Sequence, residues 1–168
     1  MNSALAEVPV WEPVLLAPPA PADAAVRADF ERRARLAGLQ PVRWPEPWPA
    51  DVRVAMLAAT FAAAAGRAVA FALAAFRQAF AGGRDLSSVD NVLIAAAACE
   101  LHPRAVLKGI ESRAVRERLE RTTGNARRLG LTDAPAVAVA GRLYTGADAV
   151  DLAAKALVVR RLGPNGMG

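Results

Sequence analysis

The chain has 168 residues, a length that fits one ordinary domain able to bury a core without disulfides or metal ions. Hydrophobic residues make up 54% of it, aromatic residues only 5%, and alanine about a quarter, which favours a mostly helical core of small side chains. The net charge of +5 rests almost wholly on Arg, in a composition typical of GC-rich coding, so we expect no nucleic-acid partner.

A single cysteine and a single histidine limit the chemistry of the side chains. Cys99 has no second thiol for a disulfide or a Cys-x-x-Cys pair, and its alanine-rich surroundings favour a small buried helical residue over a reactive thiol. His102 precedes Pro103 at an expected helix start, where a surface or capping role fits better than a metal site. We therefore expect neither dithiol chemistry nor metal binding.

The sequence shows no export signal and no membrane span. The first basic residue is Arg27, and Glu7 and Pro9 interrupt the apolar stretch that a signal sequence needs. The longest charge-free apolar run, between Arg53 and Arg67, is shorter than the roughly 18 to 20 residues of a membrane-spanning helix. We expect a cytoplasmic protein without a membrane partner.

The N-terminal third combines a strand, a helix and a proline-rich loop. Residues 8–16 mix β-branched and aromatic residues with two prolines, which predicts a short edge-like strand. Asp23 then caps a helix that we expect to reach about Gly38. Residues 41–49 hold four prolines and two tryptophans, which predicts an ordered loop. Its tryptophans either cover a thin alanine core or line a substrate site, and the first interpretation is favoured.

The middle of the chain is predicted to be helical, at residues 51–65, 67–81, 87–101 and 103–129. Gly66 and Gly82-Gly83 are stop signals between these helices, and the last of them is expected to break near Ser112. We expect the larger apolar side chains to form the contacts between helices: Met56, Leu57, Phe61, Phe71, Leu73, Phe76 and Phe80.

The pattern changes near the C-terminus. Residues 134–140 have a period of two, Gly141-Arg142 predicts a tight turn, and residues 143–145 continue as a second strand. Together they predict a β-hairpin. An amphipathic closing helix is expected from Ala147 to Val159.

Three stretches carry a resemblance to a known family. Val10-Trp-Glu-Pro-Val-Leu-Leu16 is similar to its tryptophan-x-proline-x-leucine-leucine strand, and Pro45-x-x-Trp48-Pro49-x-Asp51 to its proline-aromatic-proline-x-asparagine stretch. Residues 129–148 are similar to its valine-proline-threonine strand and glycine-x-aspartate turn. In this order they resemble the DsbA-like thioredoxin-fold superfamily, in particular the branch of 2-hydroxychromene-2-carboxylate isomerases and kappa-class glutathione transferases.

The resemblance implies an α/β, thioredoxin-like (DsbA-like) fold with a large all-helical insertion, mostly helical by residue count. Residues 1–168 would form a single domain, in which 8–16 and 130–160 are the thioredoxin-like part and 23–129 the insertion. The family's first strand and helix are missing before Val8. A start codon placed too far downstream explains this best, and a decayed paralogue or a helical domain without the sheet are the alternatives.

The resemblance also implies a glutathione site at the hairpin. A proline after a short turn and before a strand can hold a cis peptide bond and expose the edge of Ala134 to an extended thiol peptide. In this family that edge pairs with the cysteinyl part of glutathione, so Ala134 and Pro135 are candidate cofactor-binding residues. The helix start at Ala147 would face the γ-glutamyl carboxylate and Asp148 the amino group, although Asp148 also fits an ordinary helix-start carboxylate.

Trp48 and Arg53 are candidates for lining a substrate carboxylate pocket. Asp51, which replaces the family's asparagine, acts either as a base or as a helix cap, and capping is favoured. The family's catalytic serine or cysteine turn has no counterpart here, so no residue is assigned to handle the glutathione thiol.

The implied activity is that of a glutathione-dependent isomerase acting on a small aromatic or unsaturated acid, in a truncated or inactive form as given. A DsbA-like thiol-disulfide oxidoreductase missing its Cys-x-x-Cys segment and a non-catalytic helical interaction module remain alternatives. We also expect a homodimer through the alanine-rich helices.

Overall fold

The computed structural model describes residues 9–18, 21–146 and 148–162. The chain divides into two compact units, residues 1–120 and 121–168. Within the described ranges, no helix has the length and apolar character needed to cross a membrane.

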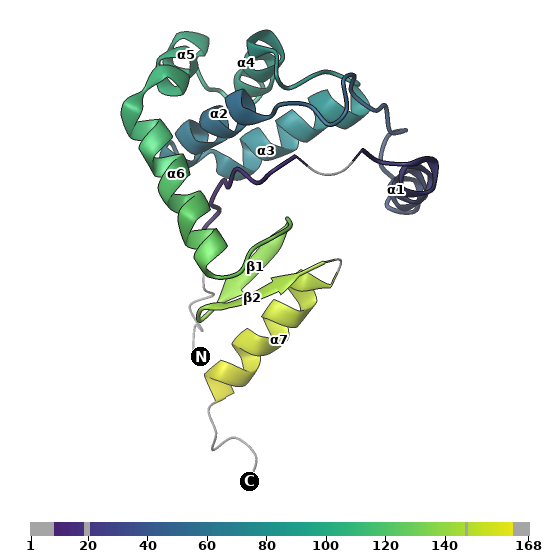
Figure 1. Ribbon diagram of the computed structural model, residues 1–168, viewed down its shortest axis with the longest axis vertical. Coiled ribbons are helices and arrows are strands. Elements are labelled where there is room, and N and C mark those ends of the chain that lie inside the picture. The colour runs from purple at the N-terminus through teal and green to yellow at the C-terminus, as the bar shows by residue number, and fades with distance from the viewer. Residues whose placement is uncertain (1–8, 19–20, 147, 163–168) are drawn as a thin grey trace, which may run out of the picture. The chain divides into compact units, whose positions relative to one another are not determined.

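The first unit is built from helices (Figure 1). In chain order these are α1 (Ala24–Leu36), α2 (Arg53–Ala64), α3 (Ala68–Phe76), the π-helical turn η1 (Arg77–Ala81), α4 (Val89–Ala97), α5 (Pro103–Glu111) and the first part of α6 (Arg113–Arg128). These elements confirm the predicted helices, and the predicted break lies at Ser112, where α5 ends. The π-helical turn at the end of α3 was not predicted.

Local hydrogen bonds fix two of the helix starts. Asp23 caps α1, since its Oδ1 accepts a hydrogen bond from the amide of Val26 at 2.8 Å. His102 caps α5, since its Nδ1 accepts from the amide of Arg104 at 3.2 Å. The capping role predicted for the lone histidine is therefore confirmed.

Alanine lines most of the core of the first unit. The buried alanines of α2, α3 and α4 are Ala55, Ala58, Ala62, Ala74, Ala75, Ala95 and Ala96. The larger side chains that are almost fully enclosed among them are Phe71, Val92 and Val106. Small side chains let helices approach closely, so the core is thin and its packing is set by a few larger residues.

Two predicted helix contacts are wrong. Leu73 and Phe76 are 52% and 60% exposed, whereas Phe71 is 1% exposed. The reason is the helical period: the buried side of α3 holds Phe71, Ala74 and Ala75, and positions 73 and 76 lie on the opposite side.

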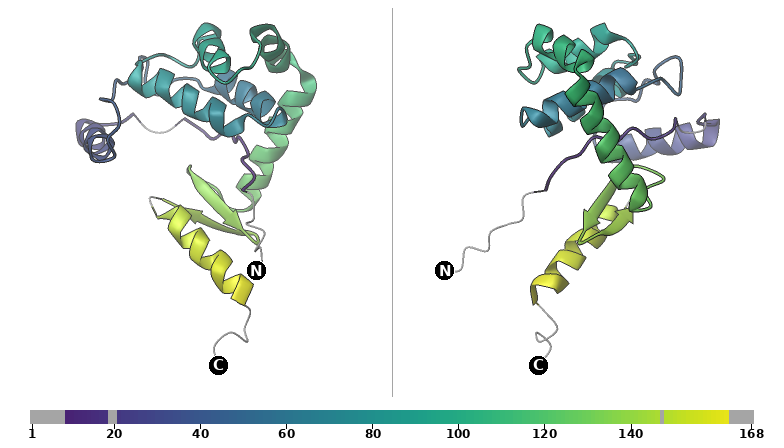
Figure 2. Two further views of the ribbon diagram at one scale, coloured as in Figure 1. Left: turned by 180° about the vertical axis from the view of Figure 1, so that it is seen from behind. Right: turned by 60° about the vertical axis from the view of Figure 1, so that its left-hand side comes forward.

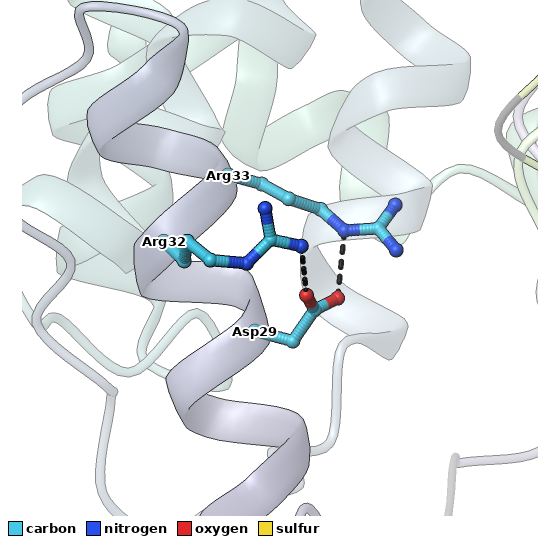
Figure 3. A network of polar contacts seen from close by, with 3 residues as sticks. All are labelled: Asp29, Arg32 and Arg33. Carbon is cyan, nitrogen blue, oxygen red and sulfur yellow. Dashed lines mark hydrogen bonds and ion pairs between the residues drawn. The ribbon is translucent and has the colours of Figure 1, made fainter.

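The exposed side of α1 carries a small ionic network (Figure 3). Arg32 donates to one carboxylate oxygen of Asp29 at 2.5 Å and Arg33 to the other at 2.7 Å. These hydrogen bonds, from Arg32 first and then Arg33, lower the pKa of Asp29. Because the folded pKa is the lower one, the stabilisation is present at neutral pH and is lost as the pH falls through it. Solvent screens these exposed pairs, so they contribute little to stability.

The second unit holds the end of α6, a hairpin and α7 (Ala149–Leu162). Strand β1 (Ala136–Val139) pairs antiparallel with β2 (Arg142–Thr145), which confirms the predicted hairpin. The connecting residues Ala140 and Gly141 both have positive φ, 50° and 79°, as a two-residue type I′ turn requires. Helix α7 packs against both strands (Figure 2).

The strand predicted over residues 8–16 is wrong. Residues 9–16 are irregular, and residue 8 lies outside the described residues. Two of these residues, Pro9 and Pro13, lack the amide hydrogen that a sheet ladder uses. Within the part of the chain that the structure describes, the sheet consists of β1 and β2 alone, so no paired strand forms here.

The tight contact between α5 and α2 at Gly109 predicts different effects for two glycine substitutions. A Cβ added at Gly109 on α5 would lie 2.5 Å from the Phe61 ring on α2, whereas one added at Gly124 on α6 would meet only the end of Arg128 at 3.6 Å. Gly109→Ala should therefore lower the free energy of unfolding by about 1 to 3 kcal/mol. Gly124→Ala should raise it by about 0.5 to 1 kcal/mol, because alanine is the better helix former.

Urea unfolding followed by circular dichroism measures both changes. Equal effects of the two substitutions would contradict the close contact between Gly109 and Phe61.

Candidate functional site

The hairpin brings the two ends of the predicted glutathione site together in the second unit. Ala136 pairs with Thr145 at the open end of the ladder. Pro135 directly precedes β1 and Gly146 directly follows β2, and Asp148 comes two residues after Gly146. The segment before β1 and the start of α7 therefore meet at one end of the hairpin. The Ala134–Pro135 peptide bond is cis, as the sequence analysis expected.

The start of α7 lies at this end of the hairpin. Asp148 directly precedes the helix, and its carbonyl oxygen accepts from the amide of Leu152 at 2.9 Å. The Asp148 side chain is exposed and makes no hydrogen bond or ion pair with the described residues, so its carboxylate is available to a ligand. The candidate Ala147 lies outside the described residues.

The outer edge of β1 offers main-chain groups to a ligand. In an antiparallel ladder alternate residues point their N–H and C=O groups away from the partner strand. In this hairpin these residues are Ala136 and Ala138, because the Val139–Arg142 pair closes the turn. Just before them, Asp133 Oδ1 accepts from the amide of Ala134 at 2.8 Å. The amide of Ala134, which a docking peptide would be expected to use, is thus already hydrogen bonded within the chain. The carbonyl of Ala134 is the other main-chain group expected to pair with a peptide.

The tryptophans of the proline-rich loop form an aromatic cluster in the first unit. Trp44 and Trp48 meet edge to face with ring centroids 5.3 Å apart, and both contact Phe80 of η1, at 6.0 and 5.7 Å. Phe30 of α1 joins the cluster through Trp44, at 5.8 Å. The favoured interpretation, that these tryptophans cover the helices, describes this packing.

The two indole nitrogens differ in their environment. Trp44 Nε1 donates to Glu31 at 3.3 Å, and the guanidinium of Arg27 lies 4.9 Å from the centroid of the Trp44 ring. Trp48 Nε1 is buried and has no hydrogen-bond partner among the described residues.

Asp51 occupies a helix-start position. Its Oδ1 accepts from the amide of Arg53 at 2.9 Å, just where α2 begins. Val52 is the N-cap residue of α2 and has no side-chain cap, so this contact from the preceding Asp51 satisfies one free amide at the helix start, as the capping interpretation expects. Arg53 is exposed and makes no ion pair with the described residues, so its guanidinium can meet an acidic ligand.

The predicted site residues thus form two groups. Ala134, Pro135 and Asp148 lie at the open end of the hairpin in the second unit. Trp48, Asp51 and Arg53 lie within six residues of one another in the first unit. Asp133 was not among the predicted site residues, although an aspartate before an alanine-proline pair is a common turn signal.

Cys99 fits the predicted buried thiol. It is 5% exposed, and its Sγ donates to the carbonyl oxygen of Ala96 at 3.1 Å. Burial raises the pKa of this thiol above its ordinary value. The thiolate, which is the reactive form, is therefore suppressed.

Comparison with known proteins identifies the family. The family model of the DSBA-like thioredoxin domain matches residues 8–158, so the chain belongs to the DsbA-like thioredoxin domain family. Among solved structures, a selenomethionine 2-hydroxychromene-2-carboxylate isomerase (HCCA isomerase) is similar with a TM-score of 0.70 and 17% sequence identity. The match covers 82% of this chain and 66% of the isomerase, just under two thirds of its length. No significant match is found among curated protein sequences.

These comparisons confirm the predicted fold class. The structure is mostly helical with a small sheet, as a thioredoxin-like fold with a large helical insertion would be. At 17% identity the likeness to the isomerase concerns the fold.

The role of Asp51 can be tested by two substitutions. Asp51→Asn keeps an oxygen that accepts the Arg53 amide, so the free energy of unfolding should stay within about 0.5 kcal/mol of wild type. Asp51→Ala removes the acceptor and should cost about 1 kcal/mol. Thermal unfolding by calorimetry distinguishes them, and equal losses in both variants would argue against the capping role.

Because the Cys99 thiol is buried, we expect it to react slowly with thiol reagents. An aromatic disulfide reagent should label Cys99 much more slowly in the native protein than in urea. Because the folded pKa is raised, the stabilisation from this thiol is complete below the unfolded pKa and is lost as the pH rises through the folded one. Absorbance of the released thiolate follows the labelling, and equal rates in native and unfolded protein would contradict the burial.

Proposed function

We propose that this chain is a glutathione-binding member of the DsbA-like family, of the 2-hydroxychromene-2-carboxylate isomerase type. One observation carries the proposal: the hairpin register brings the Ala134–Pro135 segment and the start of α7 with Asp148 to the same end of the second unit. The fold likeness to the HCCA isomerase supports it.

The main chain and one carboxylate would bind the tripeptide. The carbonyl of Ala134 and the outer edge of β1 present an extended row of donors and acceptors, onto which a peptide can add as a short strand. The free carboxylate of Asp148 would hold the ammonium group of the γ-glutamyl residue. The start of α7, with its positive end of the helix dipole, suits a carboxylate of the ligand.

The proposed chemistry is reversible addition. The glutathione thiolate forms a bond to one carbon of a conjugated double bond in the substrate, the π bond breaks, and its electron pair moves to the conjugated carbonyl as an enolate. The remaining single bond rotates. The enolate pair then re-forms the double bond as the carbon–sulfur bond breaks and its electrons return to sulfur. The thiolate is regenerated, so atoms and electrons balance without an oxidant. The protein contributes by holding thiolate and substrate in contact. No residue of this chain is assigned to activate the thiol.

We propose a small aromatic or unsaturated acid as the substrate. The exposed guanidinium of Arg53 would pair with its carboxylate, and the ring of Trp48 would contact its apolar part. A cytoplasmic location would supply the reduced glutathione that the reaction needs. The oxidoreductase alternative would need a Cys-x-x-Cys segment, and the buried Cys99 is not part of one.

Asp133 competes with glutathione for the amide of Ala134. Its carboxylate accepts the Ala134 amide hydrogen, which a docking peptide would also use. Its negative charge also lies next to the place where a ligand with carboxylates would bind. Glutathione must therefore displace the Asp133 side chain, which lowers its affinity.

Glutathione binding is testable by thermal shift and calorimetry on the full chain. Wild type should show a rise in melting temperature at millimolar reduced glutathione, because a ligand of the native state stabilises it. Asp148→Asn should weaken binding by roughly tenfold, since an ion pair to the ligand is lost. Asp133→Ala should tighten it several-fold.

Asp151→Asn is the matched control. Asp151 lies in the first turn of α7 and is also exposed, but it is one turn further along the helix than Asp148, so its substitution should leave binding unchanged. No thermal shift for wild type would rule out the glutathione site. Equal effects at positions 148 and 151 would point to the overall charge of the helix rather than to a contact at Asp148.

A further inference from the structure

Trp48 holds a polar atom that the fold leaves without a partner. Among the described residues, its Nε1 is the one buried side-chain nitrogen or oxygen that lacks a hydrogen bond. A buried indole N–H usually finds an acceptor, because an unmatched donor does not recover the hydrogen bond that it made to water. Such a group therefore needs an explanation, and an acceptor supplied by a ligand is one.

The aromatic cluster around this atom lies at the surface of the first unit. Trp44, Trp48 and Phe80 are all half-buried, and each ring contacts the other two, at centroid distances between 5.3 and 6.0 Å. Phe80 belongs to η1, where the amide of Gly82 donates to the carbonyl oxygen of Arg77 at 2.9 Å. Single π-helical turns are rare and, where they occur, often lie at functional sites. A second feature thus marks the same place as the unmatched donor.

We propose that Trp48 Nε1 donates a hydrogen bond to a carboxylate or carbonyl oxygen of an aromatic acid, whose ring takes the place of the Trp44 side chain beside Trp48. This inference rests on the class of substrate proposed above but not on glutathione. An acid suits the donor, because hydrogen bonds to a carboxylate are stronger than those to a neutral acceptor. An aromatic compound without an acceptor would leave the donor unmatched, so Trp48 would determine specificity as well as contact the ring.

The Trp44 side chain is the member of the cluster that can give way. On its other side it contacts α1, through the Phe30 ring at 5.8 Å, the guanidinium of Arg27 at 4.9 Å and the carboxylate of Glu31 at 3.3 Å. Helix α1 has no buried residue and packs against no other helix or strand that the structure describes (Figure 1). A movement of the Trp44 ring together with α1 therefore breaks few contacts.

The main chain of the loop is anchored on either side of Trp44. The amide of Arg43 donates to the carbonyl oxygen of Phe80 at 2.7 Å, and Pro45 is fully enclosed. Only the side chain of Trp44 then has to turn, and Trp48 keeps its place for the ligand.

Two-dimensional proton–nitrogen NMR of the full chain tests this hydrogen bond, with cinnamate as the probe and no glutathione present. The three tryptophans give three indole N–H signals, which single substitutions to Phe assign. We expect the Trp48 signal to move downfield when cinnamate binds, because its N–H then donates to a carboxylate. The signal of Trp11, which is 58% exposed, should stay in place. An unmoved Trp48 signal at saturating cinnamate, or no binding of cinnamate, would overturn the proposal.

Trp48→Phe separates the donor from the ring. Phenylalanine keeps an aromatic contact without the N–H, so cinnamate should bind roughly tenfold more weakly by isothermal titration calorimetry. Allylbenzene, which has a similar ring but no acceptor oxygen, should bind the variant about as it binds wild type. Trp11→Phe is the matched control and should change neither affinity. Equal weakening of both probes by Trp48→Phe would assign Trp48 a role in packing alone and contradict the proposed donor.

Two further comparisons keep the result decisive. If Trp48→Phe fails to fold, Trp11→Phe and Trp44→Phe still assign the third indole signal, and the NMR experiment on wild type decides. Cinnamate binding through Trp48 without a thermal shift by glutathione would remove the glutathione site and leave this inference intact. A thermal shift by glutathione with an unmoved Trp48 signal would do the reverse.

Discussion

The close approach of helices through alanine is the constraint on which the first unit depends. Ala58, Ala62, Ala95 and Ala96 are fully buried, and α5 comes near enough to α2 that Gly109 has no room for a methyl group beside Phe61. Such a core buries little apolar area per residue, so its stability depends on the fit of a few larger side chains. Phe71 is the largest of these, and it is enclosed on every side.

A thin core also explains where the other large side chains lie. Trp44, Trp48 and Phe80 do not fit between alanine-lined helices and instead pack against one another, with Phe30 at one end and Phe76 at the other. Leu73 and Phe76 occupy the outer side of α3 because the helical period assigns its inner side to Phe71, Ala74 and Ala75. The features available for binding in the first unit thus follow from the same alanine content that builds its core.

The sequence predicted the helices and the hairpin because each has local signals: Asp23 and His102 cap, Gly66 stops a helix, and residues 134–145 alternate around a tight turn. It failed for residues 8–16, where the pattern of a strand was present but a strand also needs a neighbour, which no local pattern supplies. It also failed for Leu73 and Phe76, since composition marks them as apolar without saying which of two faces is covered. The meeting of Pro135 with the start of α7 could be predicted only through the family resemblance. The Asp133 contact with the Ala134 amide depends on one side-chain rotamer, which a sequence does not specify.

The proposed glutathione site relies mostly on the main chain, so most side-chain substitutions in the hairpin would leave its binding groups in place. Ala134, Ala136 and Ala138 would contribute amide and carbonyl groups, which any side chain leaves in place as long as the hairpin register is kept. Side chains matter at two positions, where Asp148 offers a charge to the ligand and Asp133 competes with it. Substitutions that keep the hairpin register would therefore leave the proposed main-chain contacts in place. Within the second unit, the proposed site would thus depend on the hairpin register and on the charges at positions 133 and 148.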